Sequence, residues 1–294
     1  MNLSCTEAQS VLITGCSPGG IGHALACEFH RRGLRVLATA RNTDDIQDLS
    51  LLGIETLELV VDDAESVRQC FSEVETRVGH RGLDWLINNA GRNFTVPAVE
   101  VDLAEARALF EVNFFAVVHM CQTFLPLLMR AQGTIVQIGS ITGVLPYAFG
   151  SIYNASKAAL LAFSDTLRVE LAPFGVHVSV IITGYVQSRI ARTKRMLRED
   201  SLYQPLRVEY EHRLTHSQQG SMPHDVYARR VVARLLDPVW PCWWPRQGRA
   251  RPSRWIWEGG WSKLVMVSVG GWLWLGLWEW IFTWMLKLWK LQRK

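Results

Sequence analysis

The chain has 294 residues, of which 49% are hydrophobic and 20% charged, and its formal net charge is +4 at pH 7. These values exclude a disordered, collagen-like or coiled-coil protein and are typical of a globular chain long enough for a sizeable core. The small net charge hides an uneven distribution, since residues 246–294 carry nine Lys or Arg side chains and only two Glu side chains. The remainder is slightly acidic.

The first residues, MNLSCTEAQSVLITG, lack a basic region followed by an apolar run and a small-residue cleavage site, so we expect no secretory signal. The six cysteines are scattered and form no CxxC pair, which favours reduced thiols that face the cytosol. His212 and His216 have helical spacing, but no motif completes a metal site, and we expect none.

Short β-branched runs alternate with longer amphipathic stretches along the first two-thirds of the chain. This alternation predicts an α/β protein with a doubly wound parallel sheet. Six strands are expected at residues 10–15, 35–41, 57–63, 83–91, 133–140 and 176–184, with helices at residues 23–33, 106–130 and 153–175. Ligands bind such sheets at the carboxyl ends of the strands.

The segment VLITGCSPGGIGHALA places Gly15, Gly19, Gly20 and Gly22 between a predicted strand and a predicted helix. Glycines let the main chain turn tightly and approach a pyrophosphate, which the helix N-terminus then favours. Such a loop is weak evidence alone, because it also serves as a purely structural turn. Its position inside a βαβ unit favours a dinucleotide site.

The end of the second strand discriminates between cofactors. NAD sites place an acidic side chain there, whereas NADP sites use a nearby Arg for the 2′-phosphate. This chain has Ala40 followed by Arg41. We therefore expect NADPH/NADP+, with an exposed strand-end cation as the alternative role of Arg41.

Tyr153 and Lys157 lie four residues apart near a predicted helix start, so both project from one face. A nearby ammonium lowers the pKa of a tyrosine and makes it a usable acid-base group. Ser140, at the end of the preceding strand, can hydrogen-bond a substrate carbonyl, and Asn113 lies in an earlier helix. The combination predicts a catalytic site.

With the glycine loop and the NNAG segment, these residues give residues 9–240 a specific resemblance to the short-chain dehydrogenase/reductase family. The resemblance implies a Rossmann-type domain and a catalytic tetrad of Asn113, Ser140, Tyr153 and Lys157. Tyr153 would protonate the carbonyl oxygen as hydride arrives, Lys157 would also bind the nicotinamide ribose, and Asn113 would hold a relay water. The cofactor would contact Gly15, Ser17, Gly20, Ile21, Gly22, Arg41, Asp62 at the adenine, Asn89, Tyr153, Lys157, Val186 and Ser188.

Two departures from the family pattern are informative. The loop TGCSPGGIG is one residue longer than TGxxxGxG and resembles the branch that contains 1-acyldihydroxyacetone-phosphate reductases and some hydroxysteroid dehydrogenase-like members. The usual PGxVxT segment reads TGYVQS, with Thr183 in place of Pro and Ser188 in place of Thr. A hydroxyl remains at position 188, but without proline the main-chain φ angle at position 183 is less restricted.

Residues 185–222 are polar and strand-free, which predicts a flap of helices and loops over a substrate pocket. Five cations begin it, at Arg189, Arg192, Lys194, Arg195 and Arg198. They fit either a receptor for an anionic group or lipid, or a solvated helix face. Four prolines between Pro238 and Pro252 then mark a boundary, so we expect a domain at residues 1–245 and a tail at residues 246–294.

Twelve of the thirteen tryptophans lie between Trp240 and Trp289, and the apolar run 264–286 is long enough to span a bilayer. Glu279 interrupts this run, and it begins a polar stripe that continues through Thr283 and Lys287 to Lys290 and Lys294. A hydrophobic helical tail that lies at the membrane interface or forms a hairpin is therefore favoured. A single span, and packing on the core or on a dimer partner, remain as alternatives.

We expect a membrane-associated, NADPH-dependent oxidoreductase of a lipid-like ketone, such as an acyl ketone phosphate. It would face the cytosol, at the endoplasmic reticulum or lipid droplets. A tailoring ketoreductase or alcohol dehydrogenase of secondary-metabolite biosynthesis and a non-catalytic NADP-binding scaffold are the alternatives. The expected partners are a small carbonyl or alcohol substrate and a membrane surface, with no nucleic acid; a homo-oligomer is left open.

Overall fold

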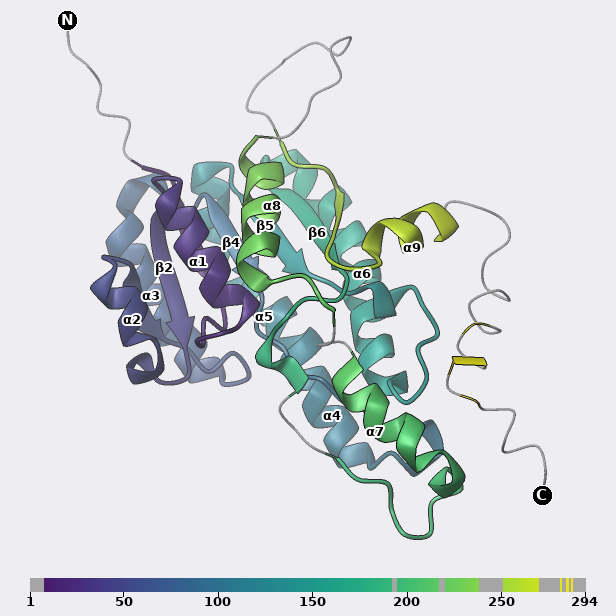
Figure 1. Ribbon diagram of the computed structural model, residues 1–294. Coiled ribbons are helices and arrows are strands. Elements are labelled where there is room, and N and C mark those ends of the chain that lie inside the picture. The colour runs from purple at the N-terminus through teal and green to yellow at the C-terminus, as the bar shows by residue number, and fades with distance from the viewer. Residues whose placement is uncertain are drawn as a thin grey trace, which may run out of the picture.

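The computed structural model describes residues 8–191, 195–216, 220–237 and 251–269, together with Ile281, Trp284, Met285 and Lys287. Within these residues, strands form one sheet in the order β3-β2-β1-β4-β5-β6-β7, and all neighbouring strands are parallel (Figure 1). The strands are β1 (Ser10–Ile13), β2 (Arg35–Ala40), β3 (Glu55–Glu58), β4 (Trp85–Asn88), β5 (Thr134–Ile138), β6 (His177–Thr183) and β7 (Trp255–Glu258).

Helices connect the strands and cover both faces of the sheet (Figure 1). The α-helices are α1 (Ile21–Arg31), α2 (Gln47–Leu51), α3 (Ala64–Val78), α4 (Leu103–Phe110), α5 (Ala116–Ala131), α6 (Ser151–Leu171), α7 (Arg207–His216), α8 (His224–Leu236) and α9 (Ser262–Val269). Short 3-10 turns are η1 (Thr43–Ile46), η2 (Gly79–Arg81), η3 (Ala98–Glu100), η5 (Ile141–Gly143), η6 (Ala172–Phe174), η7 (Arg189–Ala191) and η8 (Gln204–Leu206), and η4 (Glu111–Phe115) is a π-helix.

The strand order confirms the predicted doubly wound sheet. From β1 the chain builds outward to β3, and it then crosses back to place β4 on the other side of β1. The carboxyl ends of β1 and β4 therefore flank the topological switch point, where ligands bind in this class of fold.

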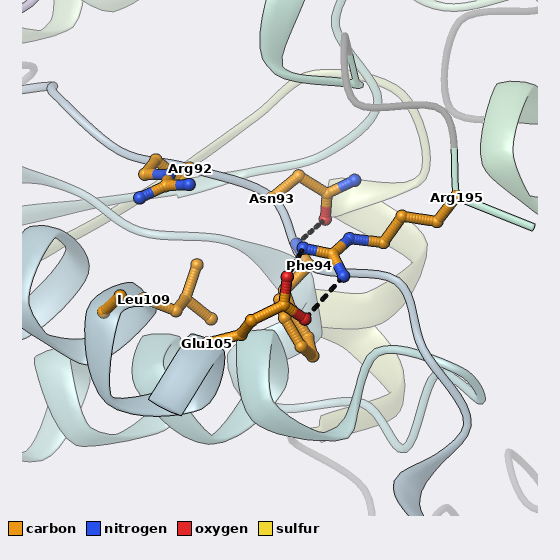
Figure 2. A pocket seen from close by; sticks show the side chains of 7 residues that line it. Arg92, Asn93, Phe94, Glu105, Leu109 and Arg195 are labelled. Atoms are coloured by element: carbon orange, nitrogen blue, oxygen red, sulfur yellow. Dashed lines mark hydrogen bonds and ion pairs between the residues drawn. The ribbon is translucent and has the colours of Figure 1, made fainter. Parts of the chain in front are cut away.

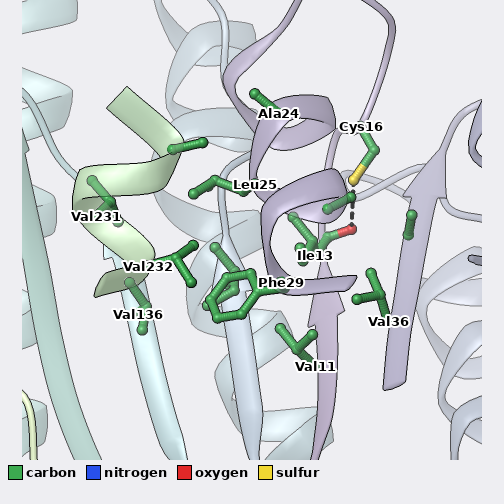
Figure 3. Close-up of a cluster of buried hydrophobic side chains, with 14 of the residues drawn as sticks. Val11, Ile13, Cys16, Ala24, Leu25, Phe29, Val36, Val136, Val231 and Val232 are labelled. Carbon is green, nitrogen blue, oxygen red and sulfur yellow. Dashed lines mark hydrogen bonds between the residues drawn. The ribbon is translucent and has the colours of Figure 1, made fainter. Parts of the chain in front are cut away.

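Alternating side chains of each strand enter two different cores. Val11 and Ile13 of β1 belong to the core under α1 and α8, where Phe29 is fully buried against them (Figure 3). Leu12, between them, enters the opposite core under α3, α5 and α6. Each such side chain contributes about 1.5–3 kcal/mol by burial, which fixes the register of β1 and hence the place of the loop that follows it.

The bounds of the predicted elements differ from those in the structure, and two of the differences have a clear local cause. The strand expected at residues 57–63 is β3, which ends at Glu58, because the Asp63 carboxylate accepts from the Glu65 N–H and begins α3. The helix expected at residues 106–130 starts at Leu103, capped by Asp102, and passes through the π-helix η4.

The sheet extends beyond the expected domain boundary at residue 245. β7 was not predicted, and it lies inside the segment assigned to the tail. It pairs in parallel with β6, and it buries Ile256 and Trp257. The Glu258 carboxylate, 2% exposed, lies 3.4 Å from Arg230 and 3.5 Å from Arg234 of α8. The sheet therefore includes β7, which covers the edge of β6.

Only part of the predicted tail helix lies among the described residues. α9 begins three residues after β7 and buries Val265, while Glu279, Thr283, Lys290 and Lys294 lie outside the described residues. Beyond α9, Ile281 packs against a core cluster and Lys287 pairs with Glu209 at 3.1 Å. Within the described part of the chain, the helix long and apolar enough to cross a membrane is Leu103–Ala131, a half-buried core helix.

Candidate active site

A glycine-rich loop joins the carboxyl end of β1 to the start of α1. Gly15 has a φ of +72° and Gly19 a φ of +68°, a region that other residues rarely adopt. A Cβ on Gly22 would lie 2.5 Å from the Asn89 Nδ2 atom, so only glycine lets the helix approach this closely. The loop thus brings bare main chain to the N-terminus of an 11-residue helix, an arrangement that favours phosphate groups.

The side chain of Asn89 braces this loop. Its Nδ2 donates hydrogen bonds to the carbonyl oxygens of Thr14, at 2.8 Å, and Gly15, at 3.0 Å. Its backbone N–H donates to the Thr14 hydroxyl at 2.9 Å. Asn89, predicted to line the cofactor site, therefore also holds the loop in shape.

Three predicted catalytic side chains meet at the carboxyl end of β5. Ser140 follows this strand, and Tyr153 and Lys157 lie in the first two turns of α6. The Ser140 Oγ bonds the Tyr153 hydroxyl and accepts from the Thr142 hydroxyl at 3.0 Å. The Lys157 Nζ lies 6.0 Å from the centroid of the Tyr153 ring. Helical spacing and the strand end together bring the three groups to one place.

Burial has opposite effects on the two titratable groups. It raises the pKa of Tyr153 above its ordinary value, while the hydrogen bond with Ser140 and the charge of Arg213 act to lower it. Burial lowers the pKa of Lys157 to about 8, and the Nζ atom donates to the Ile138 carbonyl at 2.9 Å. At neutral pH the phenol of Tyr153 therefore keeps its proton. Lys157 loses its positive charge as the pH rises through about 8.

Asn113, the fourth predicted catalytic residue, lies in the π-helix η4 and is 1% exposed. Its Oδ1 accepts from the Arg92 N–H at 2.8 Å, and its Nδ2 donates to the Arg92 carbonyl at 3.0 Å and to Ser156 at 3.2 Å. Both ends of the amide are therefore bonded to protein. The role of Asn113 in holding a relay water stays a prediction.

One cavity of about 600 Å³ is lined by both the glycine loop and the catalytic groups. The predicted residues that line it are Gly15, Ser17, Gly20, Ile21, Arg41, Asp62, Asn89, Ser140, Tyr153, Lys157, Val186 and Ser188. Gly22 and Asn113 do not line it, because Gly22 packs against Asn89 and Asn113 is buried behind Arg92. The structure thus brings together nearly all of the residues predicted from sequence.

The lining also includes residues that were not predicted, among them the charged or aromatic residues Arg92, Tyr147, Tyr185 and Arg213. Arg92 directly follows the NNAG segment, so its place in the chain could have revealed it. Arg213 lies in a helix of the flap with a polar sequence, and no local pattern shows which of its side chains turn inward.

The cations at the start of the flap fall into different environments. A Cβ on Gly19 would lie 3.2 Å from the Arg189 Nε atom, so Arg189 approaches the glycine loop and lines the cavity. Arg198 is exposed and paired with Asp200 at 2.7 Å. Arg192 and Lys194 lie outside the described residues. The anion-receptor interpretation therefore fits Arg189, and the solvated interpretation fits Arg198.

Arg195 fastens the flap to α4 (Figure 2). Its guanidinium pairs with the Glu105 carboxylate at 2.8 Å and stacks over the Phe94 ring, 4.5 Å from the ring centroid. A small cavity lies around this contact, separate from the large one, and also borders Arg92 and Leu109. Arg195 therefore holds the start of the flap against α4.

Main-chain pairing holds the TGYVQS segment despite its missing proline. Tyr185 pairs with Gly260, and Val186 pairs with Met222. Thr183, which stands where the family has proline, hydrogen-bonds the Tyr227 hydroxyl at 2.6 Å. Val186 and Ser188 line the cavity, and their contact with the cofactor stays a prediction.

A glycine-rich loop at a helix N-terminus and a tyrosine hydrogen-bonded to Ser140 share one cavity at the switch point of the sheet. Enzymes that bind a dinucleotide there and transfer hydride to or from a carbonyl carbon need both, so fold and site define a dinucleotide-dependent oxidoreductase. The family model for short chain dehydrogenases matches residues 9–198. The chain belongs to this family, which confirms the resemblance found in the sequence.

Known relatives extend this likeness. The chain is 47% identical over 208 residues to the NADPH-dependent 1-acyldihydroxyacetone phosphate reductase of Schizosaccharomyces pombe, covering 68% of this chain and 70% of that protein. It is 45% identical over 239 residues to short-chain dehydrogenase ptmH of Penicillium ochrochloron, covering 79% and 86%. A crystal structure of a short-chain dehydrogenase from Streptomyces avermitilis has a TM-score of 0.68 at 30% identity, covering 79% of this chain and 84% of that one.

Proposed function

We propose that the chain is an NADPH-dependent oxidoreductase that interconverts a ketone and a secondary alcohol, and that its substrate is lipid-like, such as an acyl ketone phosphate. The observation that carries the proposal is the single cavity lined by Arg41, the glycine loop, Ser140, Tyr153 and Lys157. The similarity of the chain to an NADPH-dependent 1-acyldihydroxyacetone phosphate reductase supports the proposed cofactor and the proposed class of substrate.

The residues around the cavity fit NADPH. Ala40, 3% exposed, occupies the place where NAD enzymes have an acid, and the exposed Arg41 beside it is available to a 2′-phosphate. The bare main chain of the glycine loop suits the pyrophosphate. Asp62 lies on the lining where the family resemblance puts the adenine.

NADPH supplies the hydride when it is bound. Ser140 holds the carbonyl oxygen of the substrate by a hydrogen bond, and the hydroxyl of Tyr153, already bonded to Ser140, gives that oxygen its proton. The ammonium of Lys157 stabilises the phenolate that Tyr153 becomes. In the reverse direction the same groups withdraw the proton from the alcohol.

Replacing Arg41 with alanine is expected to reverse the preference between cofactors. Loss of a charge-assisted contact to the 2′-phosphate should lower kcat/KM for NADPH by roughly 30-fold and leave kcat/KM for NADH nearly unchanged. The measurement is NADPH and NADH oxidation with 1-palmitoyl-dihydroxyacetone phosphate.

Arg35→Ala is the matched control, because Arg35 begins the same strand and pairs with Glu55 at 2.6 Å. If Arg41→Ala lowers kcat/KM equally for NADPH and for NADH, the assignment of Arg41 to the 2′-phosphate is wrong. Activity of the natural chain confined to small soluble ketones would contradict the lipid-like substrate.

We also propose that α9 and the following residues place the enzyme on a membrane facing the cytosol. Trp261, Leu264 and Val267 are 54%, 56% and 70% exposed, so α9 presents an apolar side to its surroundings while Val265 is buried. Trp284 is 69% exposed. Apolar side chains with tryptophan suit the interface of a bilayer, and the basic residues of the tail suit anionic lipid.

The double variant Leu264→Glu with Val267→Glu should no longer float with phosphatidylserine-containing vesicles in a density gradient, whereas the natural chain should float. Two carboxylates on the apolar side of α9 oppose both its insertion and its attraction to anionic lipid. Leu51→Glu, at a leucine 89% exposed elsewhere, controls for added charge. Flotation of the double variant equal to that of the natural chain would contradict the role of α9.

A further inference from the structure

Arg213 is a buried cation in the active-site cavity. It lies in α7 of the flap, is 5% exposed, and lines the same cavity as Tyr153. Its guanidinium carbon lies 3.7 Å from the centroid of the Tyr147 ring, so the plane of the group stacks on that ring. Stacking on an aromatic ring leaves the edge of a guanidinium, which carries its N–H donors, available to other groups.

The charge of Arg213 has no counterion in the part of the chain that the structure describes. Among the described arginines of the flap, Arg195, Arg198 and Arg207 each pair with a carboxylate, whereas Arg213 does not. The Nε atom of Arg213 is buried and makes no hydrogen bond. Burying an unpaired charge costs several kcal/mol, so a site that retains one is suited to an anion that arrives with a ligand.

Of the other cations of the cavity, Arg92 is exposed, and the remaining three are assigned to the cofactor or to the proton transfer. Arg41 follows β2, Arg189 approaches the glycine loop, and the Lys157 Nζ atom lies near the Tyr153 ring. Arg213 is separated from these by its stacking on Tyr147 and by its effect on Tyr153, whose pKa its charge lowers. Its stacking on Tyr147 and its place on the lining it shares with Tyr153 leave Arg213 for a role toward the substrate.

We propose that the Arg213 guanidinium binds the anionic group of the ketone substrate, a phosphate ester carried on the carbon next to the carbonyl. This inference rests on the proposed reductase function and names the residue that selects its substrate. A phosphate in that position reaches Arg213 while the neighbouring carbonyl oxygen reaches Tyr153 and Ser140. The planar fork of arginine matches two phosphate oxygens, which lysine cannot do.

The kinetic test compares a phosphorylated and a neutral ketone of equal acyl length. The pair is 1-hexanoyl-dihydroxyacetone phosphate and 1-hexanoyl-dihydroxyacetone, whose short chains avoid effects of micelles. Arg213→Met should lower kcat/KM for the phosphorylated ketone by roughly 30-fold or more, chiefly by raising KM. It should change kcat/KM for the neutral ketone by less than about threefold. Arg213→Lys should recover part of the loss, and Arg198→Met, at the exposed flap arginine, should change neither.

A binding measurement separates this inference from the proposed function. Calorimetric titration of the NADP+ complex with 1-hexanoylglycerol 3-phosphate and with 1-hexanoylglycerol needs no turnover. Selective loss of phosphate binding in Arg213→Met supports the role of Arg213 even if no ketone is reduced, in which case the proposed function fails alone. Equal losses for both members of the pair, or no loss, would overturn the role of Arg213 while ketone reduction by the natural chain leaves the proposed function intact.

Discussion

Replacing Tyr153 with phenylalanine is expected to lower kcat for ketone reduction by roughly a thousandfold and to leave the Kd for NADPH nearly unchanged. The variant keeps the ring but loses the proton that Ser140 helps to direct, and proton transfer of this kind contributes about 10²–10⁴ in rate. Steady-state kinetics gives kcat, and quenching of tryptophan fluorescence by NADPH gives Kd.

A non-catalytic scaffold would behave differently, because it has no turnover to lose. Thr166→Ala serves as a control within α6, since the Thr166 hydroxyl donates to the Ala162 main-chain carbonyl at 3.1 Å and does not line the cavity. Residual activity in Tyr153→Phe within tenfold of the natural chain would refute the assignment of Tyr153 as the acid.

The second large effect is expected at Lys157, both on substitution and with pH. Lys157→Met should lower kcat/KM by about a hundredfold, since it removes the cation that stabilises the phenolate and leaves the buried Ile138 carbonyl without its donor. Because burial lowers the pKa of Lys157 to about 8, its charge is present below pH 8 and lost above it. Reduction by the natural chain should therefore decline as pH rises through about 8.

A pH series of kcat/KM from 6 to 10 tests the assignment. The decline near pH 8 should vanish in Lys157→Met, whose low activity no longer depends on a titrating ammonium. Lys263→Met, at an exposed position of α9, should keep the natural profile. The same decline in both variants would assign it to a group other than Lys157.

Local patterns sufficed for the parts of the site that lie on regular elements. Ser140 ends a continuous apolar strand, and Tyr153 and Lys157 have the spacing of one helix face, so their meeting follows from the order of β5 and α6. The place of Asn89 beside the loop likewise follows from the adjacency of β1 and β4. In each case, residues far apart in the sequence lie close together because their strands or helices are neighbours in the fold.

Such local patterns could not predict contacts between segments that are far apart in the sequence. β7 is four residues long and lies among tryptophans, so its sequence resembles the remainder of the tail. It becomes a strand because β6 offers an unpaired edge and because α8 supplies Arg230 and Arg234 for the buried Glu258. Arg213 was missed for the same reason, since the ring that receives it, Tyr147, lies in a loop far away in sequence.

The pairing of Tyr185 with Gly260 connects the wall of the cavity to the start of α9. Tyr185 and Gly260 exchange two main-chain hydrogen bonds, of 2.9 and 3.0 Å, and α9 begins two residues later. A Cβ on Gly184 would lie 2.0 Å from the Gly260 carbonyl oxygen, so the two strands of chain are in the closest contact that glycine permits. Because Tyr185 lines the cavity, any displacement of α9 would act directly on the cavity wall.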